Sequence, residues 1–163
     1  MTDATVLARL HASPVRRAVG LSLLVALGAI LVWVAFSRPP EAPGWRLFLL
    51  SAGALALWLA ERMRRATRAR LELTREALCD TSGRILARVD EIRAVERGAF
   101  AFKPSGGFLL KLSAAPGAAW RPGLWWRLGR RVGVGGVTSG NEAKYMAEVI
   151  AAILAERTQA RNG

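Results

Sequence analysis

The sequence predicts an α+β membrane protein, in which a two-helix transmembrane hairpin is followed by an antiparallel β-sheet or β-barrel domain and a capping C-terminal amphipathic helix. Two long apolar runs near the N-terminus predict the hairpin. Short alternating segments between glycine and proline turns predict the sheet. The 163-residue chain is 52% hydrophobic and carries a net charge of +12, which excludes a disordered chain and is unusual for a soluble basic protein.

The first predicted span covers residues 18–37, AVGLSLLVALGAILVWVAFS, and no charge interrupts it. About 20 residues at ~1.5 Å rise per residue cross a hydrocarbon layer of ~30 Å. The alternative is a secretory signal peptide, with Arg16 and Arg17 as its basic end and Ala35 near a cleavage-like site. The run is long for a signal peptide and a second run follows, so an uncleaved anchor is favoured, preceded by a cytoplasmic segment at 1–17.

The second predicted span covers residues 45–63. Its apolar part, 47–60, is short, so a buried helix of a soluble protein is the alternative. Its ends suit a membrane interface, because Trp45 and Arg46 precede the apolar part and charged residues follow it. The sequence RPPEAPG at 38–44 predicts a short periplasmic turn. Small residues that would let the two helices approach closely are Gly20, Gly28, Ala29, Ser51, Ala52, Gly53 and Ala54.

The placement of charge predicts the orientation. Arginines gather before the first span and in a basic juxtamembrane segment, 64–70, after the second. Because Lys and Arg accumulate on the cytoplasmic side, both termini are predicted to be cytoplasmic. Residues 1–70 hold 10 Lys or Arg against 3 Asp or Glu, and residues 71–163 hold 14 against 9. The densest positive block therefore lies at the membrane exit, which favours anionic lipid headgroups over nucleic acid at ~1 kcal/mol per basic residue.

Residues 71–157 are predicted to form the cytoplasmic domain. Alternating or paired apolar residues predict strands, and clusters of Gly, Pro, Ser and Asp predict turns. The predicted strands lie within 71–78, 99–103 and 108–113, the turns at 80–83 and 104–107, and a longer connection at 114–123. Residues 84–98 fit either a short helix or an edge strand.

A block rich in tryptophan and arginine, AAWRPGLWWRLGRRVGVGG, covers residues 118–136. Alternation from Trp126 onward predicts a strand or strand pair with one apolar and one basic face. The apolar face comprises Trp126, Leu128, Val132 and Val134, with Arg130 as an exception, and the other face comprises Trp125, Arg127, Gly129, Arg131 and Gly133. Trp126 suits the core and the interface equally. Trp120 and Trp125 are predicted to meet lipid or a partner protein, because exposed tryptophans are costly without one. Stacking on nucleic-acid bases is the alternative, which the position of the charge disfavours.

The last element is predicted to be an amphipathic helix. Ser139 and Glu142 have the spacing of a capping box. The apolar stripe comprises Tyr145, Met146, Val149, Ile150, Ile153 and Leu154. Residues 158–163 are predicted to be a flexible tail.

No catalytic, cofactor or metal site is predicted. The carboxylate pairs Glu72/Glu76 and Asp90/Glu91 have no histidine or third ligand beside them in the sequence, so solvated faces and turn capping explain them better. The sequence GVGG at 133–136 lacks the last glycine of a dinucleotide loop and the Lys-Ser/Thr of a phosphate loop, so it fits a strand-ending turn.

Cysteine and histidine are equally uninformative about chemistry. Cys79 is the one cysteine, which fits a reducing compartment and a small buried apolar role. His11 is the one histidine, and it has no cysteine or histidine company for a zinc site.

The segment LARVDEIRAVE, Leu86–Glu96, and the order of elements resemble the bacterial pleckstrin-homology-like (PH-like) membrane proteins. Asp90, Glu91 and Ile92 match the family's segment, whereas Val89 stands where a tryptophan is usual. The resemblance implies a PH-like domain at 71–157 with seven strands, against about five found by pattern. It also implies a bacterial inner-membrane protein whose cytoplasmic module serves interaction or scaffolding, in a family with few defined enzymes. We therefore expect no enzymatic activity, and an enzyme that acts on a lipid or nucleotide is the least favoured alternative.

The expected role is that of an accessory, scaffold or assembly subunit of a larger membrane protein complex, and the alternative is an anionic-lipid-binding sensor or regulator. The expected partners are the membrane, anionic phospholipids and that complex, with no nucleic acid and no cofactor. The residues predicted to form the lipid or partner surface are Arg62, Arg64, Arg65, Arg68, Arg70, Trp120, Arg121, Trp125, Arg127, Arg130 and Arg131.

Overall fold

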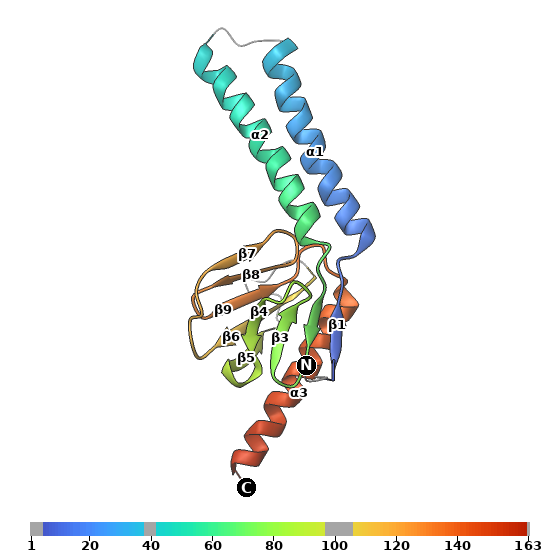
Figure 1. The fold of residues 1–163 in the computed structure, drawn as a ribbon, viewed down its shortest axis with the longest axis vertical. Helices are drawn as coiled ribbons and strands as arrows, with labels where there is room; N and C mark the ends of the chain where they lie inside the picture. The colour runs from blue at the N-terminus through green and yellow to red at the C-terminus, as the bar shows by residue number, and fades with distance from the viewer. Residues whose placement is uncertain (1–4, 38–41, 97–105, 163) are drawn as a thin grey trace.

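A computed structural model describes residues 5–37, 42–96 and 106–162 of the chain. Helices α1 (Pro14–Ser37) and α2 (Pro43–Ala66) form an antiparallel pair that projects from a β domain, as Figure 1 shows. Helix α3 (Gly140–Asn162) lies against that domain and extends beyond it at the end opposite the hairpin (Figure 1). The order of elements predicted from the sequence, an apolar hairpin, a sheet domain and a C-terminal helix, is therefore confirmed.

Two glycines bring the helices of the hairpin into close contact. A Cβ atom added to Gly28 would lie 2.7 Å from Leu57 Cγ, and one added to Gly53 would lie 2.8 Å from Val32 Cγ2. Both glycines are buried, which confirms the predicted close approach. Of the other small residues predicted at this contact, those exposed are Ala29, Ser51 and Ala54.

Both helices are long and apolar enough to cross a membrane. Only 11% of the apolar window of α1 and 17% of that of α2 is buried, which does not fit a helix in the core of a soluble protein. The strand before α1, β1 (Ala8–Leu10), pairs with β2 (Leu71–Leu73) after α2, and Leu10 is completely buried. Cleavage of α1 as a signal peptide would remove this strand from the sheet, so the structure favours an uncleaved α1.

The domain contains two antiparallel sheets in the described residues. The first has the order β1-β2-β3-β4 and the second the order β5-β6-β9-β8-β7. A 3-10 turn, η1 (Val89–Glu91), carries the chain from one sheet to the other. The sheets are not closed into a barrel, so the barrel alternative is wrong and the open-sheet alternative holds. The remaining strands are β3 (Ala77–Asp80), β4 (Ile85–Arg88), β5 (Ile92–Glu96), β6 (Phe108–Leu112), β7 (Ala119–Arg121), β8 (Trp125–Leu128) and β9 (Arg131–Val134).

Several predicted segments differ in detail. The ambiguous residues 84–98 contain two strands, β4 and β5, which the turn η1 separates. The predicted connection at 114–123 contains the edge strand β7. The predicted strand at 99–103 lies outside the described residues, as do the first two residues of the turn at 104–107. Helix α3 continues to Asn162, through most of the segment predicted as a tail.

The β8–β9 hairpin reverses part of the predicted face assignment. Leu128 pairs with Arg131 across a two-residue turn, so each even-numbered residue of β8 faces an odd-numbered residue of β9. Directly opposed residues share a face of the sheet. Trp125 pairs with Val134 and is only 2% exposed, so it belongs to the core. Trp126 pairs with Gly133 on the other face, and its ring lies where a Cβ atom of that glycine would be.

The core lies between the two sheets and α3. Its largest fully buried side chains come from both sheets and from α3, and burial of each such side chain contributes ~1.5–3 kcal/mol. On α3, the buried residues are Ala143, Met146, Ala147 and Ile150. Tyr145, predicted to belong to the stripe, is 56% exposed. Glu142 does not close a capping box, because its Oε2 accepts the backbone N–H of His11 at 2.7 Å.

Candidate functional site: a basic pocket at the end of α2

Both helices of the hairpin are packed against the domain. Before α1, the backbone N–H of Ser13 donates to the carbonyl of Val137 at 2.7 Å. At the end of α2, Met63 is buried, and its Cε lies 2.8 Å from where a Cβ of Gly20 would be and 3.2 Å from that of Gly123. Met63 therefore fills the space where α1, α2 and the β7–β8 turn meet.

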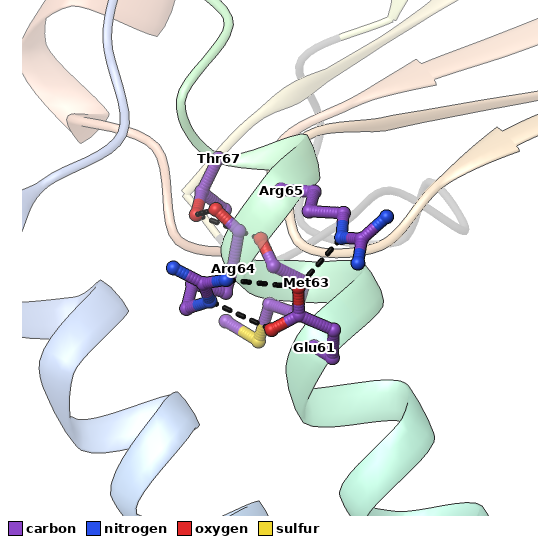
Figure 2. Close-up of polar contacts among 5 residues, drawn as sticks. All are labelled: Glu61, Met63, Arg64, Arg65 and Thr67. Atoms are coloured by element: carbon purple, nitrogen blue, oxygen red, sulfur yellow. Dashed lines mark hydrogen bonds and ion pairs between the residues drawn. The ribbon is translucent and has the colours of Figure 1, made fainter.

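One glutamate organises the basic end of α2. Figure 2 shows the carboxylate of Glu61 between the side chains of Arg64 and Arg65, which leave it in different directions. It accepts hydrogen bonds from Arg64 Nε at 2.7 Å, Arg64 Nη2 at 2.9 Å and Arg65 Nε at 2.6 Å. The hydroxyl of Thr67 donates to the carbonyl of Met63 at 2.8 Å, which satisfies a carbonyl at the helix end (Figure 2). Cations at this terminus also offset the negative end of the helix dipole.

A basic pocket of about 210 Å³ lies between the end of α2, the β3–β4 turn and strand β7. Four of its seven lining residues are arginines, and no carboxylate lines it in the described part of the chain. Trp120 forms an aromatic part of the wall and is 51% exposed. The lining residues are Arg62, Arg65, Ala66, Arg84, Trp120, Arg121 and Pro122.

The pocket arginines differ in how they are compensated. Arg65 is bound to Glu61, and Arg121 donates to Ser82 Oγ at 2.9 Å. Arg62 lies over the ring of Trp58, with its guanidinium carbon 5.0 Å from the ring centroid. Arg84 has an exposed side chain at the end of the β3–β4 turn.

A buried aspartate fixes the wall that carries Arg84 and Arg121. Asp80 Oδ1 accepts the backbone N–H groups of Ser82 at 2.9 Å and Arg84 at 3.1 Å, and also the hydroxyl of Ser82. Its Oδ2 lies 3.8 Å from Arg121 Nη2. The aspartate side chain is completely buried, so it sets the shape of the turn and attracts the nearby guanidinium without entering the pocket.

The structure separates the eleven predicted surface residues into groups. Those that line the pocket are Arg62, Arg65, Trp120 and Arg121, whereas Arg64, Arg68, Arg70, Arg130 and Arg131 are exposed outside it. Trp125 belongs to the core, so its predicted interfacial position is not what the structure shows. Arg84 was not predicted, although its position directly after the predicted Asp80–Gly83 turn is a signal that could have pointed to it.

Arg127 connects the two sheets. Its Nε donates to the carbonyl of Gly117 at 3.0 Å, and its Nη1 donates to the carbonyls of Ile85 at 3.0 Å and Leu86 at 3.3 Å. These carbonyls belong to β4 in the first sheet and to the connection before β7 in the second. Its guanidinium is therefore occupied in joining elements of the fold, which is a different role from the predicted surface contact.

An apolar patch lies across β7, the edge strand of the second sheet, and its neighbour β8. Trp120 and Trp126 are cross-strand partners there. Beside them, Leu128 is 67% exposed. A shallow hollow of about 410 Å³ over this patch is lined by Ala118, Ala119, Trp120, Trp126, Arg127 and Leu128.

The remaining candidate chemical groups have structural partners. Glu72 pairs with Arg9 at 3.3 Å, and Asp90 lies 3.9 Å from Arg88. Within residues 5–37, 42–96 and 106–162, no three His, Cys, Asp or Glu side chains are arranged to hold a metal ion. Burial raises the pKa of the Cys79 thiol, and the neighbouring carboxylates of Asp80 and Glu72 raise it further.

The glycine-rich sequence after β8 has a packing role. Gly133 belongs to β9 and lies beneath Trp126. Gly136 has φ of +121°, and a Cβ there would lie 2.9 Å from the carbonyl oxygen of Gly123. These glycines permit close backbone packing at the end of the strand.

In comparisons with known proteins, no family model, curated protein or solved structure matches this chain.

Proposed function

We propose that the chain is a non-enzymatic integral protein of the bacterial inner membrane. In this proposal, α1 and α2 cross the bilayer, and a PH-like domain on the cytoplasmic side serves as an accessory or scaffold unit of a larger membrane complex. The pairing of β1 with β2 is the observation that carries the topology. Because one strand precedes α1 and the other follows α2, a hairpin that spans the bilayer leaves both on the same side.

The ends of the hairpin support the same placement. Arg46 lies over the ring of Phe36 at 5.6 Å at the turn end, and Arg62 lies over Trp58 at 5.0 Å at the domain end. Aromatic and snorkelling basic residues are enriched at the two interfaces of a membrane. The excess of arginine at the domain end supports a cytoplasmic location for the domain.

Two features support a role in protein interaction. Trp120 on the edge strand β7 and Trp126 and Leu128 on its neighbour β8 line one hollow, and Trp120 and Leu128 are exposed. An exposed apolar patch of this kind is typical of a protein or membrane contact. The two antiparallel sheets followed by a C-terminal helix support the PH-like relationship, although the nine strands within the described residues exceed the seven that the resemblance implies.

The test uses the full-length chain in bacterial membranes. Carbonate-resistant membrane association and a cytoplasmic reporter fused after Gly163 are expected. Native electrophoresis in mild detergent is expected to show a complex that Leu128→Ser weakens and the control Ile85→Ser, at a similarly exposed residue on β4, does not. Release by carbonate or a periplasmic reporter would contradict the topology, and a free monomer or equal behaviour of the two variants would contradict the interaction role.

The basic pocket favours a second candidate function, the binding of anionic lipid as a sensor or regulator. Four arginines line a cavity next to the last turn of a helix long enough to span the membrane. The two functions are compatible, because the apolar patch and the pocket are lined by different residues and share only Trp120.

A further inference from the structure

We propose that the basic pocket binds one phosphate group, and that this phosphate belongs to an anionic phospholipid of the cytoplasmic leaflet. The inference rests on the membrane topology proposed above and assigns the second candidate function to a specific site. Three features point to this ligand: the uncompensated charge of the pocket, its size, and the surface of α2 that leads into it.

The charge of the pocket suits a single phosphate. Glu61 is shared between Arg65 and Arg64, and Asp80 lies 3.8 Å from Arg121. In the described part of the chain, no carboxylate is paired with Arg62 or Arg84. About two positive charges therefore remain at the pocket, and guanidinium groups are well suited to the oxygens of a phosphate.

The size of the pocket suits a headgroup phosphate better than a whole soluble ligand. Its volume of about 210 Å³ is smaller than the roughly 300–1,000 Å³ of typical small-molecule sites. Trp120 and Pro122 line the pocket beside Arg121, and the turn fixed by Asp80 carries Arg84. The walls are thus placed before a ligand arrives, which lowers the cost of ordering them.

The outer surface of α2 identifies a lipid as the source of the phosphate. Leu55, Trp58 and Arg62 lie on one face of the helix at spacings of three and four, and both apolar side chains are about half exposed. An acyl chain that packs along this stripe brings its headgroup to Arg62 at the mouth of the pocket. A free phosphate ion would make no use of the stripe.

The test compares two double variants of the full-length chain with equal loss of charge. Arg62→Gln with Arg84→Gln removes the two uncompensated pocket arginines. Arg130→Gln with Arg131→Gln removes two exposed arginines of the β8–β9 region outside the pocket. Phosphatidylglycerol or phosphatidylcholine is titrated into each purified protein in neutral detergent, and lipid-bound protein is counted by native mass spectrometry.

The wild-type chain is expected to bind phosphatidylglycerol in preference to phosphatidylcholine. The pocket variant is expected to bind phosphatidylglycerol about 30-fold more weakly, from about fivefold per basic residue at a membrane surface, and the control variant within about twofold of wild type. Circular dichroism and the thermal unfolding midpoint verify that the variants are folded.

Two outcomes would overturn the proposal. Equal weakening in both double variants would mean that diffuse charge attracts the lipid. Displacement of phosphatidylglycerol by millimolar inorganic phosphate would assign the pocket to a soluble phosphate. Failure of the proposed function is a separate result, because it appears as release of the chain by carbonate, whereas failure of this inference leaves an integral membrane protein without headgroup preference.

Discussion

The role of Arg127 can be tested directly, because the sequence predicts a surface contact whereas the structure shows hydrogen bonds that join the two sheets. Replacement of Arg127 by Gln removes hydrogen bonds to the carbonyls of Gly117, Ile85 and Leu86. A buried hydrogen bond to a charged group contributes ~1.5–3 kcal/mol to the free energy of unfolding. Because these contacts are partly exposed, we expect the three bonds together to contribute only ~2 kcal/mol. For a domain of this size, that loss lowers the unfolding midpoint by ~10 °C.

The assay is the thermal unfolding of the full-length chain in detergent, followed by tryptophan fluorescence. The matched control is Arg131→Gln, which removes the same charge from an exposed side chain four positions away. It is expected to change the free energy of unfolding by less than ~0.5 kcal/mol. Binding of phosphatidylglycerol by Arg127→Gln below its unfolding temperature is expected to equal that of wild type. An unchanged midpoint together with lost lipid binding would refute the structural role and restore Arg127 to the binding surface.

Three further predictions concern packing, the turn and the thiol. Gly53→Ile is expected to destabilise the hairpin by ~1–3 kcal/mol through overpacking, whereas Ala54→Ile, on the exposed side, is not; equal melting of the two variants would contradict the close helix contact. Asp80→Asn is expected to lower the free energy of unfolding by ~1–3 kcal/mol in chemical denaturation because it weakens a buried charged acceptor, and Asp90→Asn is the exposed control; an equal loss in both would disprove the role of the buried aspartate. The pKa of the partly buried Cys79 thiol is raised by desolvation and then by the carboxylates of Asp80 and Glu72, so the thiol is expected to stay protonated at neutral pH. It should react with iodoacetamide more slowly than a cysteine peptide, at a rate that increases as the pH rises towards that pKa, and fast alkylation at pH 7 would contradict the raised pKa.

The helices were predictable because their signals are long and local. An uncharged run such as residues 18–37 identifies its helix without knowledge of its neighbours. The contact at Gly28 and Gly53 was also predictable in kind, since glycine permits close approach. The predicted apolar stripe of α3 is correct for Met146 and Ile150 and wrong for Tyr145. The buried face includes the alanines at 143 and 147, so it is displaced around the helix, away from Tyr145. Small residues carry little hydropathy signal, yet they let α3 lie close to the sheets.

The sheets were less predictable because strand faces depend on turns. The two-residue turn after Leu128 changes which residues of β8 and β9 share a face, and an alternation count that runs through the turn cannot register that change. Trp125 was therefore placed outside although it is a core residue. Strand β7 was missed because three residues with a proline beside them give no periodic signal.

The candidate site was predictable only as a charged region. Arginine runs locate the membrane exit, but contacts distant in sequence decide what each arginine does. Arg65 is compensated by Glu61 within one helical turn, Arg127 is occupied by carbonyls about 40 residues earlier in the chain, and Arg84 reaches the pocket from a different strand connection. The sequence orders these residues by position, whereas their chemistry depends on the partners that the fold supplies.

The attachment of the domain to both helices has a consequence for recognition at a membrane surface. A domain on a flexible tether must lose orientational freedom each time it meets a headgroup, and that entropy weakens binding. Here β1 leads into α1, β2 follows α2, and Met63 packs at the joint. These connections hold the pocket about one helical turn beyond Trp58 on α2. In the topology proposed above, an anionic headgroup beside α2 would lie near Arg62, so a pocket held at this height would need less affinity of its own.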